Sequence, residues 1–247
     1  MTDIDLSNIK PFETRDGSTT LYDEVRDIHY RSWHGAVSES RHVFLDGTAL
    51  KDRGSRWRVA ELGFGAAVNF TQTVQAFRSC EAAVQLIYHS VDWRPVTADH
   101  LGFHKGEAGT IARRAVDKYH SDGQSLITVR SDDEAIELHL HAQPWDDVNL
   151  AGFSAHAFYH DPFSKRVNAE AWSAESFARA KAAMEEGGRL ATYSAATSVK
   201  RAMFEAGLSV ATAPGPGRKR EMTIASPVPD ALDGLQLLDS SRYLKTS

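Results

Sequence analysis

The feature that most constrains the fold is an alternation of short apolar runs and amphipathic segments that begins at Arg58. Short apolar runs between turn residues are typical of strands, and the longer segments between them have helical periodicity. This pattern predicts an α/β fold with a mostly parallel sheet and helices on both faces. We expect strands near residues 59–62, 84–88, 126–129, 136–140, 155–159, 190–193, 208–211 and 222–225. We expect helices near 66–78, 108–120, 173–186 and 198–206, with Ser173 as the N-cap of the third.

The flanking segments differ from this regular region. Residues 1–57 mix turn signals with short apolar pieces, and the piece at 42–45 reads as a strand. We therefore expect an N-terminal β-rich extension, residues 1–57, packed on a main domain of residues 58–226, with a loosely ordered C-terminal tail at 227–247. A chain of 247 residues is long enough for one sizeable core.

Composition excludes several classes of protein. No apolar run approaches the roughly 20 residues that a membrane span needs, and Met1–Lys10 has no apolar segment typical of a secretory signal. The single cysteine, Cys80, cannot form an internal disulfide, which suits the cytoplasm. A net charge of −5 counts against a broad phosphate-binding surface. The eleven histidines match no metal-binding motif, so we expect no metal.

A glycine-containing turn follows the first strand of the main domain. Gly63 and Gly65 stand where a strand passes into a helix, and such glycines let the backbone approach a ligand closely. A dinucleotide-binding loop usually has a third glycine, and Ala67 occupies that place. The turn alone is also compatible with a simple strand-to-helix connection.

An acidic residue after the second strand strengthens the case for a nucleoside ligand. Asp92 can accept hydrogen bonds from both ribose hydroxyls, which suits either a dinucleotide or S-adenosylmethionine. Glu61, at the end of the first strand, would repel a diphosphate but can hold the cationic methionine end of S-adenosylmethionine. Together with the incomplete diphosphate loop, Glu61 favours S-adenosylmethionine as the cofactor.

Motifs in the same order along most of the chain resemble the MnmC-like family, that is, the methyltransferase domain of a bacterial tRNA wobble-uridine modification enzyme. The most specific of them is the basic segment Gly217–Met222. The residues that carry the resemblance are Asp16–Tyr22, Tyr30, Ser32, Gly35, Ala36, Glu39–Arg41, Val43–Leu45, Glu61–Asn69, Asp92–Pro95, Asp161, Phe163, Asn168, Trp172, Gly188–Tyr193, Ala206, Gly207 and Gly217–Met222.

This resemblance implies a Rossmann-like class I fold of S-adenosylmethionine-dependent methyltransferases with a seven-stranded sheet. It also implies methyl transfer to the amine of 5-aminomethyl-uridine at the tRNA wobble position, so that the tRNA anticodon region is the expected partner. The flavin-dependent oxidoreductase domain of the family has no room in 247 residues. A separate oxidoreductase partner is therefore expected, while the oligomeric state stays open.

The resemblance also assigns roles to particular residues. Asp161 would orient the amine and accept its proton, although an aspartate before Pro162 can equally cap a turn. Glu61, Gly63, Gly65, Asn69 and Asp92 would bind the cofactor. The expected substrate-binding residues are Phe163, Asn168, Arg218, Lys219 and Arg220; the basic run would serve anticodon phosphates or pair with a buried carboxylate.

The sequence departs from the family pattern at Ala67, Ala142 and Pro162. Three functions therefore stay open: a tRNA wobble-uridine methyltransferase, a methyltransferase acting on a small-molecule or peptide amine, and a binding protein that has kept the fold without catalysis.

Overall fold

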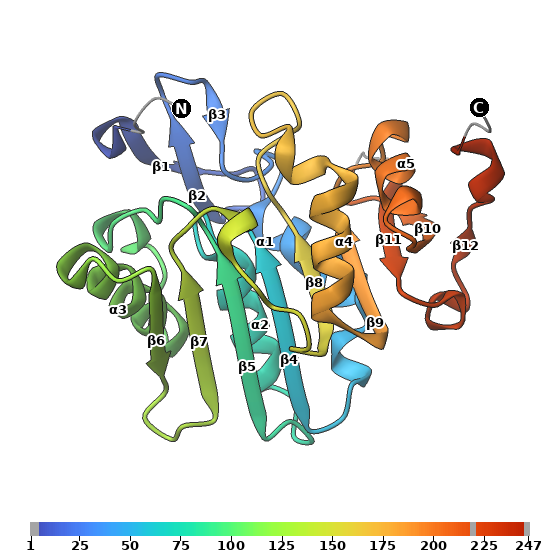
Figure 1. The fold of residues 1–247 in the computed structure, drawn as a ribbon. Helices are drawn as coiled ribbons and strands as arrows, with labels where there is room; N and C mark the ends of the chain where they lie inside the picture. Colours follow the sequence, from blue (N-terminus) through green and yellow to red (C-terminus); the bar gives the residue numbers. More distant parts are fainter. Residues whose placement is uncertain (1–4, 218–220, 245–247) are drawn as a thin grey trace.

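The computed structural model describes residues 5–217 and 221–244, and it confirms the predicted α/β architecture (Figure 1). Within these residues, nine strands form one sheet in the order β12-β10-β11-β9-β8-β4-β5-β7-β6. The seven strands from β10 to β7 match the predicted seven-stranded sheet, and β12 and β6 extend its two edges. The strands are β4 (Arg56–Leu62), β5 (Gln85–Val91), β6 (Leu126–Arg130), β7 (Ile136–His141), β8 (Ala155–His160), β9 (Met184–Thr192), β10 (Ser209–Pro214), β11 (Glu221–Ser226) and β12 (Gln236–Leu237).

The central strands run parallel. β4 pairs with β5 and β8, β5 pairs with β7, and β8 pairs with β9, all in parallel. Antiparallel pairing is confined to β6 with β7 at one edge and to β9, β11, β10 and β12 at the other. The carboxyl ends of the central strands therefore meet at one edge of the sheet, where ligands bind in open α/β folds.

Helices cover both faces of the sheet, as alternating strands and helices predict. The helices α2 (Val68–Arg78) and α3 (Gly106–Asp122) pack behind β4 to β7 in the view of Figure 1, and α4 (Ala174–Ala183) packs in front of β8 and β9. The fifth helix, α5 (Thr197–Glu205), contacts α4 and β10. Each face has its own core of buried apolar side chains, with Phe70 and Tyr88 in one and Phe158 and Phe177 in the other.

A small antiparallel sheet precedes the main one. It consists of β1 (Ile9–Glu13), β2 (Thr19–Asp23) and β3 (Ile28–His29), and it lies beyond the carboxyl ends of the central strands in Figure 1. The strand predicted at 42–45 is wrong. After α1 (Ala36–Ser40), the chain continues as a π-helix at Arg41–Asp46. Consecutive residues from Val43 to Leu45 are all buried, which an alternating strand on one face of a core does not allow.

Two further predictions need correction. The helix expected at 173–186 ends at Ala183, because Glu185–Gly188 belong to β9, whose first residue pairs with β8. Its N-cap is as predicted, since the Ser173 hydroxyl accepts a hydrogen bond from the Ser176 amide at 3.1 Å. The tail expected to be loosely ordered instead contains a 3-10 helix with a fully buried Leu232, followed by β12 paired with β10.

The connection between β7 and β8 has no α-helix. Residues 142–154 contain only the 3-10 turn Trp145–Asp147, so the sheet face in front of β5 and β7 carries polar side chains. The imidazole rings of His139 and His141 stack on His89, with centroids 4.2 and 5.2 Å from its ring.

Within residues 5–217 and 221–244, no three His, Cys, Asp or Glu side chains are grouped as metal ligands. None of the helices described is both long and apolar enough to cross a membrane.

Candidate functional site

The site is built from three loops that leave the sheet at the same edge. Leu62, the last residue of β4, pairs with Val91 of β5 and with His160 of β8. The amide of Gly63 then donates to the Val91 carbonyl at 2.9 Å, and the amide of Asp161 donates to the Leu62 carbonyl at 3.0 Å. This alignment confirms that the turn after β4 and the loops after β5 and β8 begin side by side.

The turn after β4 requires glycine at two positions. Gly63 has a φ of +104°, and a Cβ there would lie 2.5 Å from the Asp161 carbonyl oxygen. Gly65 has a φ of +49°, in the left-handed region that side chains disfavour. Gly63 thus lets the loop after β8 pack directly on the turn, whereas Gly65 leaves the main chain beside Tyr30 without a side chain.

Ala67 adopts the backbone that a third glycine would have. Its φ of 55° and ψ of 19° place it in the left-handed region at the start of α2, although it has a fully buried methyl side chain. This conformation costs an alanine roughly 1–2 kcal/mol. Alanine in place of the expected glycine therefore adds backbone strain at position 67 but preserves the path of the turn.

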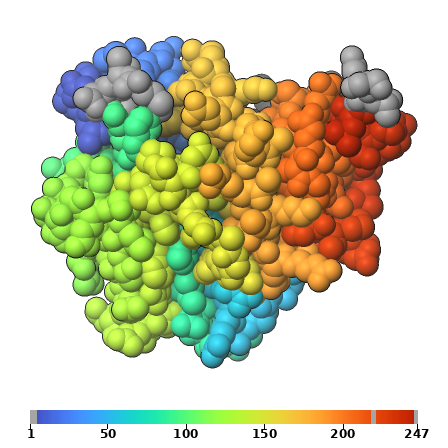
Figure 2. All heavy atoms as spheres, in the orientation of Figure 1, coloured from blue at the N-terminus to red at the C-terminus, as the bar shows by residue number. Residues whose placement is uncertain are grey.

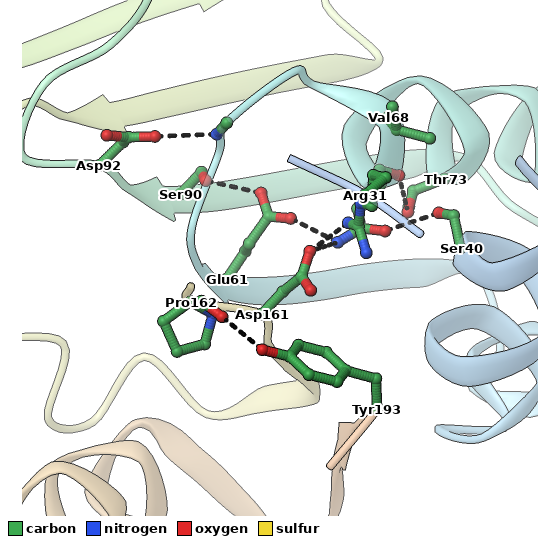
Figure 3. Close-up of polar contacts among 12 residues, drawn as sticks. Arg31, Ser40, Glu61, Val68, Thr73, Ser90, Asp92, Asp161, Pro162 and Tyr193 are labelled. Atoms are coloured by element: carbon green, nitrogen blue, oxygen red, sulfur yellow. Dashed lines mark hydrogen bonds and ion pairs between the residues drawn. The ribbon is translucent and has the colours of Figure 1, made fainter. Parts of the chain in front are cut away.

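Asp92 supports the turn from the neighbouring loop. One carboxylate oxygen accepts a hydrogen bond from the Gly65 amide at 2.8 Å (Figure 3), and the other accepts one from the Arg94 amide at 3.0 Å. Each carboxylate oxygen has two lone pairs, so both retain capacity to accept a further hydrogen bond. Binding of ribose hydroxyls by Asp92 stays a prediction.

Glu61 lies at the centre of a buried polar network. Its side chain accepts hydrogen bonds from the Asn69 amide at 2.8 Å and from the Ser90 hydroxyl at 2.6 Å. Burial raises the pKa of Glu61 to about 7, against the opposing effect of these two donors. A carboxyl group so placed can hold a proton or a cation close to neutral pH.

Asn69 connects Glu61 to Asp161. Its side-chain nitrogen donates to Glu61 and also to Asp161, the latter at 3.0 Å, while its oxygen accepts from the Ser40 hydroxyl at 2.6 Å. All of its hydrogen-bonding groups therefore have at least one protein partner. Asn69 joins the predicted cofactor side of the site to the predicted catalytic residue.

The partner of Asp161 was not predicted from the sequence. Arg31, which follows the small sheet, forms an ion pair with the Asp161 carboxylate through its Nη2 atom (Figure 3). Both side chains are buried, and Nη1 of Arg31 has no hydrogen-bond partner among the described residues. Burial raises the pKa of Asp161, whereas the Arg31 guanidinium opposes that shift. The sequence analysis singled out the neighbours Tyr30 and Ser32 through the family resemblance, but no pattern linked Arg31 to Asp161.

The loop after Asp161 contains two of the predicted substrate-binding residues. The Phe163 ring packs edge-on against Tyr30, with centroids 5.0 Å apart, so it lies beside the glycine turn that Tyr30 also contacts. Asn168 instead stabilises its own loop, because its side-chain oxygen accepts from the Ala171 amide at 3.4 Å. Substrate binding by either residue stays a prediction. The predicted run Arg218, Lys219 and Arg220 lies outside the described residues.

Comparisons with known proteins point to a methyltransferase family. A family model described as S-adenosyl-L-methionine-dependent methyltransferase matches residues 106–227. The chain is 32% identical over 233 residues to the tRNA 5-methylaminomethyl-2-thiouridine biosynthesis bifunctional protein MnmC of Cupriavidus metallidurans, covering 89% of this chain and 34% of that protein. It is 30% identical over 220 residues to the Hahella chejuensis protein of the same name, covering 85% of this chain and 35% of that one. The chain thus spans about a third of the length of these relatives.

A solved structure shares the fold. The crystal structure of MNMC2 from Aquifex aeolicus superposes with a TM-score of 0.70 at 21% identity, covering 89% of this chain and 70% of that one. At this identity, the likeness extends to the fold alone.

Proposed function

This chain belongs to the S-adenosyl-L-methionine-dependent methyltransferase family, and from that premise we propose that it methylates the amine of 5-aminomethyl-uridine at the wobble position of a tRNA anticodon. The relatives are named for the biosynthesis of 5-methylaminomethyl-2-thiouridine, a product that carries a methylated aminomethyl group. The observation that carries the proposal is the buried network in which Asn69 joins Glu61, beside the glycine turn, to Asp161.

The residues at the carboxyl end of β4 fit the cofactor. Gly65 carries no side chain and would allow a ligand to approach the main chain, Asp92 would accept the ribose hydroxyls, and Glu61 would hold the cationic methionine end. Asn69 would keep the Glu61 carboxyl group in place. When bound, S-adenosylmethionine supplies an electrophilic methyl group on its sulfonium.

Asp161 and Arg31 would act on the acceptor amine. An alkyl ammonium with a pKa of roughly 10 must lose a proton before its nitrogen can attack. The Asp161 carboxylate would orient the amine and accept that proton. The Arg31 cation disfavours a second cation beside it, so it would favour the neutral amine. Alignment of donor and acceptor can contribute roughly 7–11 kcal/mol to the rate.

The first test is calorimetric titration of S-adenosylmethionine into the purified protein and into the Asp92→Ala variant. We expect binding that weakens in the variant. The second measurement is transfer of a labelled methyl group to tRNA carrying 5-aminomethyl-uridine, with tRNA lacking that modification as the control and Asp161→Asn as the inactive variant.

The outcomes separate the remaining functions. A folded protein that does not bind S-adenosylmethionine would contradict any methyltransferase role and leave a binding protein. Binding without methylation of tRNA, together with methylation of a free alkyl amine, would favour a small-molecule substrate. The relatives are named as bifunctional proteins, and we propose that an oxidoreductase activity in the same cytoplasmic compartment prepares the substrate of this chain.

A further inference from the structure

Two exposed tryptophans lie close to site residues in the chain, and an arginine guanidinium packs over the ring of each. Trp33 is 43% exposed, and the guanidinium carbon of Arg15 lies 3.8 Å from its ring centroid. The exposed His34 ring packs against the same indole at 4.4 Å. Trp93 is 37% exposed, with the Arg94 guanidinium 4.7 Å from its ring. An exposed indole ring offers a flat surface on which the base of an unpaired nucleotide can stack.

The chain places both tryptophans next to the site. Trp93 directly follows Asp92, and Trp33 comes two residues after Arg31, so each backbone lies within about 7 Å of a site residue. The amide of Arg15 donates to the Trp33 carbonyl at 3.0 Å, which ties the turn between β1 and β2 to this loop. The stacked pair of Arg15 and Trp33 is therefore held in place by the backbone.

Cationic side chains extend this surface on the other side of the site. Lys165 and Arg166 are exposed in the loop that begins at Asp161. That loop contacts the N-terminal segment through Tyr30 and Phe163, and the two segments lie together along the top of the space-filling view (Figure 2). Neither Lys165, Arg166 nor Arg15 forms an ion pair with another described residue. These cations thus lie on a protein of net charge −5 and have no ion-pair partners among residues 5–217 and 221–244.

We propose that this aromatic and cationic rim, formed by Arg15, Trp33, Trp93, Lys165 and Arg166, binds the unpaired nucleotides that flank the methyl acceptor in an RNA loop. Unpaired bases stack on tryptophan and arginine planes, and the basic side chains bind the phosphates between them. The inference rests on the proposed function in one respect, namely that the acceptor amine belongs to a nucleotide. A free alkyl amine or a peptide has no base to occupy two tryptophans.

The test measures RNA affinity by fluorescence anisotropy, with a fluorescein-labelled RNA stem-loop as the probe and the same stem closed as a duplex for comparison. Trp33→Ala is compared with Val84→Ala, a change at an apolar residue that is 61% exposed just before β5, at the opposite edge of the sheet. Arg15→Ala is compared with Arg56→Ala, a change at an exposed arginine at the start of β4. Calorimetric titration with S-adenosylmethionine is run on every variant.

We expect Trp33→Ala to bind the stem-loop at least about 5-fold more weakly, while Trp33→Phe and Val84→Ala bind like the wild type. Arg15→Ala should lower the slope of log affinity against log salt concentration by about 0.7, the value for one single-stranded phosphate contact, and Arg56→Ala should not. All five proteins should bind S-adenosylmethionine as the wild type does.

Other outcomes would overturn the inference. Stem-loop affinity unchanged in Trp33→Ala, or equally weakened in Val84→Ala, would show that the rim does not bind bases. Equal affinity of the wild type for stem-loop and duplex would exclude unpaired nucleotides as the ligand. If the wild type binds S-adenosylmethionine but no RNA, the rim proposal fails while the methyltransferase function stands. If Trp33→Ala also fails to bind S-adenosylmethionine, the RNA affinity of Trp33→Phe and the salt dependence of Arg15→Ala test the proposal instead. Weakened binding in Trp33→Phe together with an unchanged slope in Arg15→Ala would then overturn it.

Discussion

Arg31 and Asp161 form an ion pair in which the two side chains are only 6% and 8% exposed. Asn69 donates to the same Asp161 oxygen that Arg31 contacts, so the carboxylate is held from two sides. Two opposite charges in such surroundings are stable only as a pair, because either charge alone would lack both water and a counter-ion. Changes at these two residues should therefore not act independently.

The first prediction concerns stability. Arg31→Met should lower the free energy of unfolding by roughly 3–5 kcal/mol, because it leaves a buried carboxylate unpaired. Adding Asp161→Leu should recover much of that loss, because the second change removes the remaining charge. Chemical denaturation of the wild type, both single variants and the double variant measures the coupling. Additive losses would mean that the ion pair contributes nothing beyond its separate residues.

The second prediction concerns the pH dependence of methyl transfer. Burial raises the pKa of Asp161, and the Arg31 cation opposes that rise and disfavours a protonated amine beside it. Without the cation, both groups hold their protons to higher pH. The kcat profile of Arg31→Met should therefore rise at higher pH than that of the wild type. Arg41→Met, at a nearby arginine that donates to Gln72, is the control and should leave the profile in place. An unshifted profile in Arg31→Met would limit Arg31 to a structural role.

The third prediction concerns Ala67, which stands where a third glycine is expected. Because its backbone is already left-handed, Ala67→Gly should change the affinity for S-adenosylmethionine by less than about 5-fold. Ala67→Val should unfold at lower denaturant concentration, since a β-branched residue is poorly tolerated at positive φ. Calorimetry and chemical denaturation measure the two effects. A large gain in affinity for Ala67→Gly would instead mean that the alanine impairs the cofactor site.

The fourth prediction concerns acid stability and the stacked imidazoles on β5 and β7. Burial, together with the neighbouring imidazoles, lowers the pKa of His89 to about 3 and that of His141 to about 4. Burial also lowers the pKa of His139, although Glu137 beside it opposes the shift and Arg130 adds to it.

Between about pH 6.5 and pH 3–4, these histidines bind fewer protons in the folded state than in the unfolded state. The free energy of unfolding should therefore be highest above about pH 6.5 and should fall as the pH is lowered toward 3–4. His89→Phe should flatten this part of the curve of unfolding free energy against pH. A variant with the same acid limb as the wild type would exclude the imidazole stack as its source.

Much of the fold was predictable from periodicity. The parallel strands and the main helices follow local patterns, and their bounds differ from prediction by a few residues. The errors arose where one sequence pattern is compatible with two secondary structures. The apolar run at Val43–Leu45 suits a buried helix as well as a strand, and the glycine pair at the end of the α4 segment resembles a helix stop although it lies in β9. The pairing of β9 with β8 decided the second case, whereas the burial of three consecutive residues in a π-helix decided the first.

The candidate site was predictable only where sequence neighbours carry it. Gly63, Gly65, Asp92 and Asp161 were identified because each stands directly after a strand that ends at the same edge. Arg31 was missed because its partner is far away in the chain and its surroundings read as an extension. The contacts of Asn69 with both Glu61 and Asp161 depend on how α2 packs against the main sheet, and no local sequence pattern encodes that packing.

The ion pair between Arg31 and Asp161 also bears on the order of folding. Its two residues are 130 positions apart, so the pair closes a chain loop that includes β4, β5, β7 and the helices between them. The pairing of β8 with β4 places Asp161, but Arg31 reaches it only when the N-terminal segment docks on the assembled sheet. A folding intermediate with its sheet assembled but its N-terminal segment undocked would therefore have an incomplete candidate site. The proposed methyl transfer would then require a docking step that sheet formation alone does not provide.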